Sequence, residues 1–117
     1  MKKILVVDDE KDIRELISIS LRSEGFNVDK AASGKAALDV LKADNVDLML
    51  LDIMMPGMDG YATAEKVREF SNVPIIIVSI RADDITDEQK KKFHFSAVIQ
   101  KPFESTVLLH AVNEAVS

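Results

Sequence analysis

Short runs of apolar residues recur along the chain, and each is followed by a polar residue. The three clearest runs are residues 4–7, 48–51 and 75–78, which stop at Asp8, Asp52 and Ser79. Because these runs are continuous rather than alternating, they are typical of strands that are buried on both faces. A shorter run at 98–99 stops before Gln100 and Lys101. Residues 26–28 form a weaker, alternating candidate, which we expect at an edge of the sheet.

The segments between these runs carry apolar residues at helical spacing. In the first, Ile13, Leu16, Ile17 and Leu21 form the stripe and Gly25 ends it. Four further segments predict helices, around residues 37–41, 61–68, 86–93 and 107–115. Strands that alternate with helices imply a parallel sheet covered by helices on both faces. Since no linker or repeat interrupts the pattern, we expect residues 1–117 to form a single α/β domain.

Composition narrows the classes of function. The 117 residues, 47% of them apolar, can bury the core of one domain, and the absence of cysteine excludes disulfides and thiolate metal sites. A net charge of −5 argues against direct nucleic-acid binding, which needs a basic face. No apolar run approaches the roughly 20 residues of a membrane span. The first apolar run meets two aspartates at once, unlike a signal peptide, so we expect a cytoplasmic protein without membrane association.

Polar residues at the strand ends carry the candidate chemistry. Ligands of open parallel sheets bind outside the carboxyl ends of the strands. The pattern places five polar residues on that rim: Asp8, Asp9, Asp52, Ser79 and Lys101. Converging carboxylates repel one another and favour a bound cation, and Mg²⁺ accepts carboxylate, water and phosphate oxygens. A carboxylate held there can attack phosphorus, so Asp52 is the candidate phosphoryl acceptor, with charge neutralised by Lys101 and a hydrogen bond from Ser79.

Each of these residues also has a plainer interpretation. Asp8 and Asp9 can simply cap a helix that begins near Glu10. Ser79 alone would be an ordinary residue at the end of a strand, and Lys101 alone a solvated lysine. The shared rim favours the chemical interpretation over these separate ones.

Three motifs resemble the receiver domain of two-component response regulators. They are ILVVDDE at residues 4–10, DLMLLDIMMPGMDG at 47–60 and KPF at 101–103. The resemblance extends from residue 2 to about residue 115. It implies a flavodoxin-like fold, a doubly wound five-stranded parallel sheet of strand order 2-1-3-4-5 with five helices on two faces.

The resemblance also implies the phosphoryl-acceptor and metal roles. Asp52 matches the aspartate that receives a phosphoryl group from a histidine kinase or a phosphotransfer protein. Asp8, Asp9 and Asp52 match the carboxylates of a Mg²⁺ site, which the backbone carbonyl of Met54 completes. A phosphohydrolase with an aspartyl nucleophile is the less favoured alternative, because such enzymes place a second Asp where this chain has Met54.

The same resemblance assigns the remaining site residues. Ser79 matches the switch hydroxyl, and Lys101 matches a lysine whose bond to Pro102 is normally cis. The protein is then a signalling switch that catalyses only its own phosphorylation and dephosphorylation. Its output partner or downstream domain is unknown from the sequence. The fourth helix, fifth strand and fifth helix often form a partner or homodimer face in relatives.

Two positions depart from the family pattern. The switch aromatic of the family falls at Val98, which has no ring, and the small residue after the switch hydroxyl is replaced by Ile80. These departures leave an alternative open, in which the protein is a constitutive interaction module with weakened switch coupling.

Overall fold

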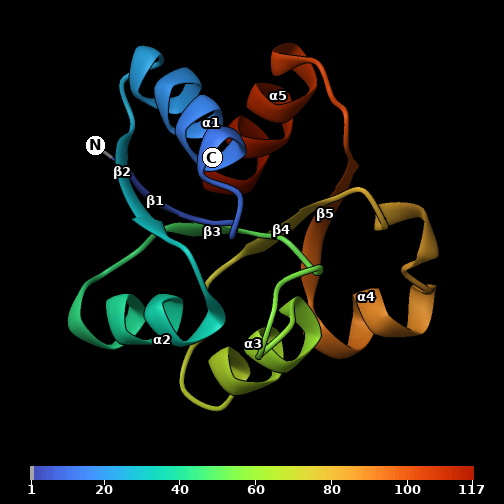
Figure 1. Cartoon of the computed structure of the whole chain (residues 1–117). Coiled ribbons are helices and arrows are strands. Elements are labelled where there is room, and N and C mark those ends of the chain that lie inside the picture. Colours follow the sequence, from blue (N-terminus) through green and yellow to red (C-terminus); the bar gives the residue numbers. More distant parts are fainter. Residues whose placement is uncertain (1) are drawn as a thin grey trace.

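A parallel sheet forms the centre of the molecule, shown in Figure 1 as a computed structural model that describes residues 2–117. Within those residues the sheet has five strands: β1 (Lys3–Val7), β2 (Asn27–Ala31), β3 (Leu48–Leu51), β4 (Ile75–Ser79) and β5 (Phe95–Gln100). Every strand pair is parallel and the order is β2-β1-β3-β4-β5. The predicted fold class and strand order are therefore confirmed.

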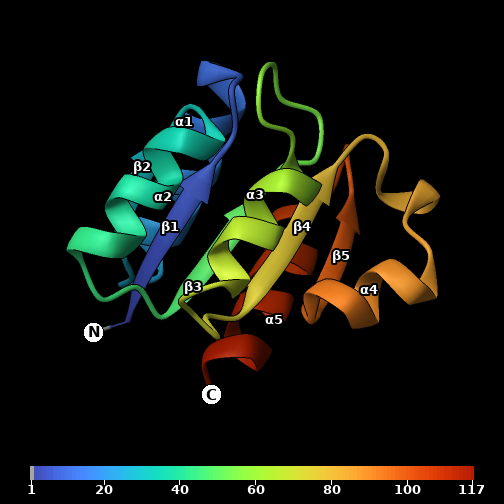
Figure 2. The same ribbon diagram turned by 90° about the horizontal axis from the view of Figure 1, so that it is seen from below.

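Helices cover both faces of the sheet. Over residues 2–117 the helical segments are α1 (Lys11–Ser23), α2 (Gly34–Ala43), α3 (Gly60–Arg68), the 3₁₀ turn η1 (Ala82–Asp84), α4 (Asp87–Phe93) and α5 (Ser105–Val116). α1 and α5 lie on one face, and α2, α3 and α4 lie on the other (Figures 1 and 2). Each helix in the described part of the chain is too short or too polar to span a bilayer.

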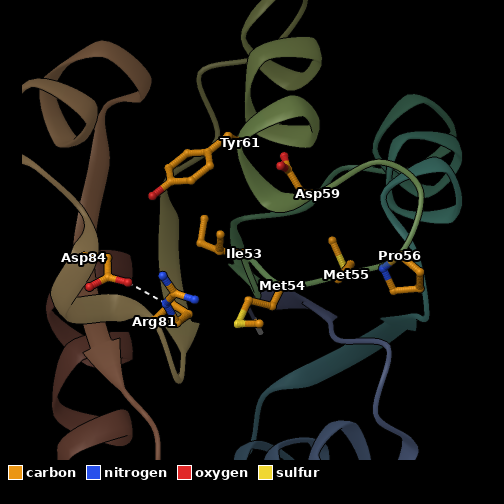
Figure 3. Close-up of a pocket in the computed structure, with 8 residues that line it drawn as sticks. All are labelled: Ile53, Met54, Met55, Pro56, Asp59, Tyr61, Arg81 and Asp84. Atoms are coloured by element: carbon orange, nitrogen blue, oxygen red, sulfur yellow. Dashed lines mark hydrogen bonds and ion pairs between the residues drawn. The ribbon is translucent and has the colours of Figure 1, made fainter.

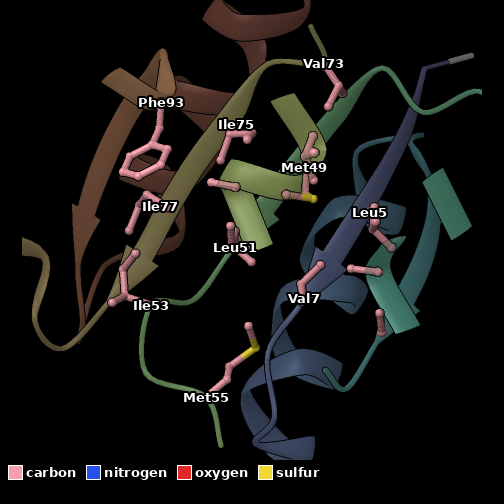
Figure 4. Packing of buried hydrophobic residues seen from close by; sticks show 14 of the residues in the cluster. Leu5, Val7, Met49, Leu51, Ile53, Met55, Val73, Ile75, Ile77 and Phe93 are labelled. Atoms are coloured by element: carbon pink, nitrogen blue, oxygen red, sulfur yellow. The ribbon is translucent and has the colours of Figure 1, made fainter. Parts of the chain in front are cut away.

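The two faces of the central strands supply two different cores. The α2–α4 core takes alternate strand residues: Leu5, Val7, Met49, Leu51, Ile75 and Ile77 (Figure 4). The core under the two helices α1 and α5, called the α1–α5 core, contains the strand residues between them: Ile4, Val6, Leu48, Leu50, Ile76 and Val78. None of these side chains is more than 2% exposed. The apolar runs are continuous because both faces of β1, β3 and β4 are buried.

The edge strands differ from their sequence predictions. β2 is an edge strand as expected, but it begins after Phe26 and continues to Ala31, whereas the pattern predicted 26–28. Phe26 packs against the α1–α5 core before the strand begins. Asp29 and Lys30 give β2 little apolar signal, and they pair with Lys3 and Glu15 at 3.4 and 2.6 Å.

β5 and the segment after β4 were also incompletely predicted. β5 runs from Phe95 to Gln100 and is longer than the expected 98–99. The prediction was too short because Ser96 and Ala97, which are polar and small, interrupt the apolar pattern inside the strand. The turn η1 was not predicted at all. Its three residues include two aspartates, and it lies between β4 and α4.

Gly60 begins α3 directly against the segment that carries Asp52. A Cβ atom on residue 60 would lie 2.5 Å from the carbonyl oxygen of Asp52 and 2.6 Å from the Cα of Ile53. The amide of Gly60 donates to the carbonyl of Ile53 at 2.9 Å, and the side chain of Asp59 caps the helix. This close backbone approach requires glycine at position 60.

Substitution of Gly60→Ala is expected to destabilise the fold by about 1–3 kcal/mol, the usual cost of forcing atoms into a packed region. The added methyl group meets backbone atoms, which have little freedom to move aside. Urea unfolding followed by circular dichroism measures the effect. Glu65→Ala, at an exposed position of α3, is the control and should change stability by no more than about 0.5 kcal/mol. Equal stability of the two variants would contradict the prediction.

Candidate functional site

Four strand ends bring the candidate residues to one edge of the sheet. Asp8 and Asp9 follow β1, Asp52 follows β3, Ser79 ends β4 and Lys101 follows β5. All four strands are parallel, so their carboxyl ends share this edge. The structure thus places the five residues on the rim that the sequence indicates.

The Lys101 side chain joins two of the aspartates. Its Nζ atom lies 2.7 Å from Oδ2 of Asp8 and 3.0 Å from Oδ2 of Asp52. The residues are buried, with 8%, 1% and 4% of their surfaces exposed for Lys101, Asp8 and Asp52. A buried charge is costly unless it is paired, and here one ammonium serves two carboxylates. In the region from residue 2 to residue 117, no buried side-chain nitrogen or oxygen lacks a hydrogen-bond partner.

The other carboxylate oxygen of Asp8 makes a contact of the kind expected if Asp8 caps the helix that follows it. Oδ1 of Asp8 accepts a hydrogen bond from the amide of Glu10 at 2.9 Å. Glu10 is the N-cap residue of α1, and no side chain caps the helix there. Capping-like contact therefore uses one oxygen of Asp8, while its second oxygen is committed to Lys101.

Arg14 supports the site from α1, which sequence reasoning missed. Its Nη1 atom donates to the backbone carbonyl of Asp8 at 2.8 Å. This contact fixes the end of β1 against the first turn of the helix. A basic residue in the first turn after the aspartate pair was the available signal, although its partner is a backbone atom that no pattern marks.

The pKa values of Asp8 and Lys101 are both raised, but for different reasons. Burial raises the pKa of the Asp8 carboxyl above its ordinary range, and hydrogen bonds from Lys101 and Glu10 offset only part of this effect. Burial tends to lower the pKa of the Lys101 ammonium, but its hydrogen bonds to Asp8 and Asp52 outweigh burial and raise that pKa. Lys101 therefore stays charged at neutral pH.

The three carboxylates also fit a divalent cation. Asp8, Asp9 and Asp52 each offer an oxygen, and these oxygens all lie within 4.8 Å of one another. Asp9 is exposed at the mouth of the cluster, whereas the other two are buried. Three carboxylates against the single ammonium of Lys101 leave an excess of negative charge. An all-oxygen set of this kind suits Mg²⁺.

Ser79 and Met54 lie beside this cluster with contacts of their own. Ser79 is fully buried, and its hydroxyl oxygen accepts from the amide of Arg81 at 3.1 Å. The amide of Met54 donates to Oδ1 of Asp52 at 3.1 Å, while its side chain is 45% exposed. The switch role of Ser79 and the metal-binding role of the Met54 carbonyl stay predictions. The peptide bond between Lys101 and Pro102 is cis.

The two positions that depart from the family pattern lie on opposite sides of the sheet. Val98 is half-buried and packs against the α2–α4 core. Ile80 is 57% exposed and lines a groove of about 310 Å³ together with Pro102 and Phe103. Neither side chain supplies an aromatic ring next to Ser79.

Relatives of known sequence match nearly the whole chain. Residues 4–113 match the family model of the response regulator receiver domain. The transcriptional regulatory protein CpxR homolog of Haemophilus influenzae is 37% identical over 109 residues, which cover 93% of this chain and 48% of that protein. The transcriptional regulatory protein CseB of Streptomyces coelicolor is 36% identical over 106 residues, which cover 91% and 45%. The chain thus spans about half the length of these relatives.

Solved structures share the fold over almost every residue. The response regulator protein TrrA of Thermotoga maritima, in complex with Mg(2+)-BeF, has a TM-score of 0.90 and 34% identity, covering 98% of this chain and 99% of that one. The chemotaxis protein CheY4 of Vibrio cholerae has a TM-score of 0.89 and 28% identity, with 98% of both chains covered. Together with the family match over residues 4–113, these similarities establish that the chain belongs to the response regulator receiver domain family of two-component signalling.

Proposed function

We propose that Asp52 accepts a phosphoryl group from a histidine kinase or a phosphotransfer protein, and that this change switches partner binding or output. The observation that carries the proposal is the buried contact of Lys101 with both Asp8 and Asp52. This contact holds the acceptor carboxylate of Asp52 at a rigid strand end. The Lys101 ammonium beside it can neutralise the charge of an incoming phosphoryl group. Membership of the receiver family supports the same role.

The chain's own residues position the reaction. One carboxylate oxygen of Asp52 attacks phosphorus while the bond from phosphorus to the donor nitrogen breaks, and the donor leaves with that electron pair. The amide of Met54 and the ammonium of Lys101 orient the carboxylate beforehand. The Ser79 hydroxyl accepts from the Arg81 amide, which leaves its proton available for a phosphoryl oxygen. Such positioning and charge neutralisation provide most of the catalysis in phosphoryl transfer.

Mg²⁺ is the cofactor that this donor set fits. Asp8, Asp9 and Asp52, with the backbone carbonyl of Met54, are the residues that would hold it. When bound, the ion supplies neutralising charge for the phosphoryl oxygens and relieves the repulsion among the carboxylates.

The proposal extends to the biological setting. Residues 1–117 act as one receiver domain in the cytoplasm, and their catalysis is confined to their own phosphorylation and dephosphorylation. The output belongs to a partner or a downstream domain, since the matched relatives are transcriptional regulatory proteins about twice as long. A homodimer through the face formed by α4, β5 and α5 is one form that the switch can take.

A constitutive interaction module is the second candidate function. The observation that favours it is Val98, which packs as an aliphatic side chain where the family pattern has an aromatic ring. Partner capture by the purified protein separates the two candidates. Capture that is unchanged in Asp52→Asn, with and without a phosphoryl donor, would favour the constitutive module.

Incubation with acetyl phosphate and Mg²⁺ is expected to add one phosphoryl group to the wild-type protein, measured by intact-mass spectrometry. Asp52→Asn should show no adduct because it lacks the nucleophilic carboxylate. Asp59→Asn is the matched control, since this exposed aspartate caps α3 and asparagine can still cap it. The same adduct on Asp52→Asn would place the phosphoryl group elsewhere and overturn the assignment.

Addition of Mg²⁺ is expected to raise the melting temperature of the wild-type protein, because a ligand that binds only the folded state stabilises it. At about a hundredfold excess over Kd the gain is about 2.7 kcal/mol. Asp9→Ala should abolish the rise, whereas Asp12→Ala, at an exposed position of α1, should keep it. A wild-type melt that is indifferent to millimolar Mg²⁺ would count against the cation site.

Substitution of Lys101→Met is expected to destabilise the protein by about 3–5 kcal/mol, the cost of removing one partner from a buried charge pair. It leaves the buried carboxylates of Asp8 and Asp52 facing each other without an ammonium group. Chemical denaturation at neutral pH measures the loss, with the exposed Lys66→Met as control. Wild-type stability of Lys101→Met would show that the contact contributes nothing to folding.

A further inference from the structure

A cavity of about 490 Å³ lies beside Asp52, between two loops of the rim. Ile53, Met54 and Met55 line it from the segment after Asp52, and Arg81 and Asp84 line it from the segment after Ser79. Tyr61 contributes from the first turn of α3, with its ring above Ile53 (Figure 3). Any change at Asp52 or Ser79 that displaces either loop therefore alters the surroundings of the Tyr61 ring.

Tyr61 connects this cavity to α4 and β5. Its hydroxyl donates to Oε1 of Gln89 at 3.3 Å. Its ring centroid lies 5.9 Å from that of Phe93, and Phe93 lies 5.5 Å from Phe95 at the start of β5. Aromatic pairs at these separations have a preferred mutual geometry, so a displaced ring disturbs its neighbour.

The Gln89 contact places the Tyr61 hydroxyl at the beginning of α4. Oε1 of Gln89 also accepts from the amide of Thr86 at 3.0 Å, and the amide of Gln89 donates to Oγ1 of Thr86 at 3.1 Å. These two bonds form the capping box of α4, a helix of only seven residues. Oε1 of Gln89 accepts from both the Tyr61 hydroxyl and the Thr86 amide, so movement of Tyr61 disturbs the cap at the N-terminus of α4.

The wall of the cavity opposite Tyr61 depends on Ser79. The Arg81 amide donates to the Ser79 hydroxyl, and the Arg81 side chain pairs with Asp84. If the hydroxyl of Ser79 turns toward a phosphoryl group on Asp52, the amide of Arg81 loses its acceptor. Loss of this hydrogen bond frees the loop that carries Arg81 and Asp84 to move relative to the cavity.

We propose that Tyr61 is the positioning residue that transmits phosphorylation of Asp52 to α4, in place of the ring that is missing at Val98. The coupling rests on the proposed phosphoryl-acceptor function. Its path runs from the two loops of the cavity to the Tyr61 ring, and from there to Gln89 and Phe93.

Fluorescence offers a direct test, because Tyr61 is the only tyrosine of a sequence that has no tryptophan. Beryllofluoride with Mg²⁺, used as a mimic of the phosphoryl group, should change the tyrosine emission of the wild-type protein. Asp52→Asn should show no change under the same conditions. An emission that stays constant while the mimic binds the wild-type protein would overturn the coupling through Tyr61.

Amide NMR spectra with and without beryllofluoride test the path itself. In the wild-type protein the amides of Ile53 and Met54 and those of α4 should all shift. In Tyr61→Leu the shifts at residues 53 and 54 should remain, while those of α4 should be clearly smaller than in the wild-type protein. Tyr61→Phe keeps the ring and should retain the part of the α4 response that Phe93 carries. Phe26→Leu, which alters a half-buried ring on the α1–α5 core, is the control and should behave as wild type.

The outcomes separate this inference from the function on which it rests. No shift at residues 53 and 54 in the wild-type protein, together with no phosphoryl adduct by mass, would remove the acceptor function and the coupling with it. Normal shifts at 53 and 54 with an unchanged α4 response in Tyr61→Leu would overturn the coupling alone.

Discussion

The contact of one buried ammonium with two buried carboxylates is the interaction on which the rest of the site depends. Lys101 reaches Asp8 and Asp52 from the end of β5, so the contact ties together the ends of β1, β3 and β5. Charges in such surroundings persist only when they are paired. The pairing remains incomplete, because Asp9 adds a third carboxylate and the cluster keeps a negative excess that favours a cation.

The sequence predicted the central strands well and the edge strands poorly, for a physical reason. β1, β3 and β4 are covered on both faces, so every position except the end residues Lys3 and Ser79 is apolar, and the run is easy to recognise. β2 and β5 each have one neighbour and tolerate polar or small residues, such as Asp29 in β2 and Ser96 in β5. Their bounds therefore depend on pairing with β1 and β4, which no local pattern reveals.

The convergence of the site residues was predictable, but their contacts were not. Parallel topology alone brings the strand ends to one edge, which is why Asp8, Asp52 and Lys101 were expected together. That Lys101 would bridge both aspartates depends on side-chain reach and packing across strands. The connection of Tyr61 to α4 was invisible for a similar reason, because the hydrogen bond joins residues 28 positions apart on two different helices.

The alternation of β1, β3 and β4 between two cores constrains how the length of this chain can change. Inserting or deleting one residue within such a strand would turn every later side chain of that strand toward the wrong helices. Changes in length are also restricted at the carboxyl edge of the sheet, because the loops there contain the acidic cluster and line the cavity. Changes in length are therefore better tolerated at the opposite edge of the sheet, for example in the links 44–47 and 69–74 that lead into β3 and β4.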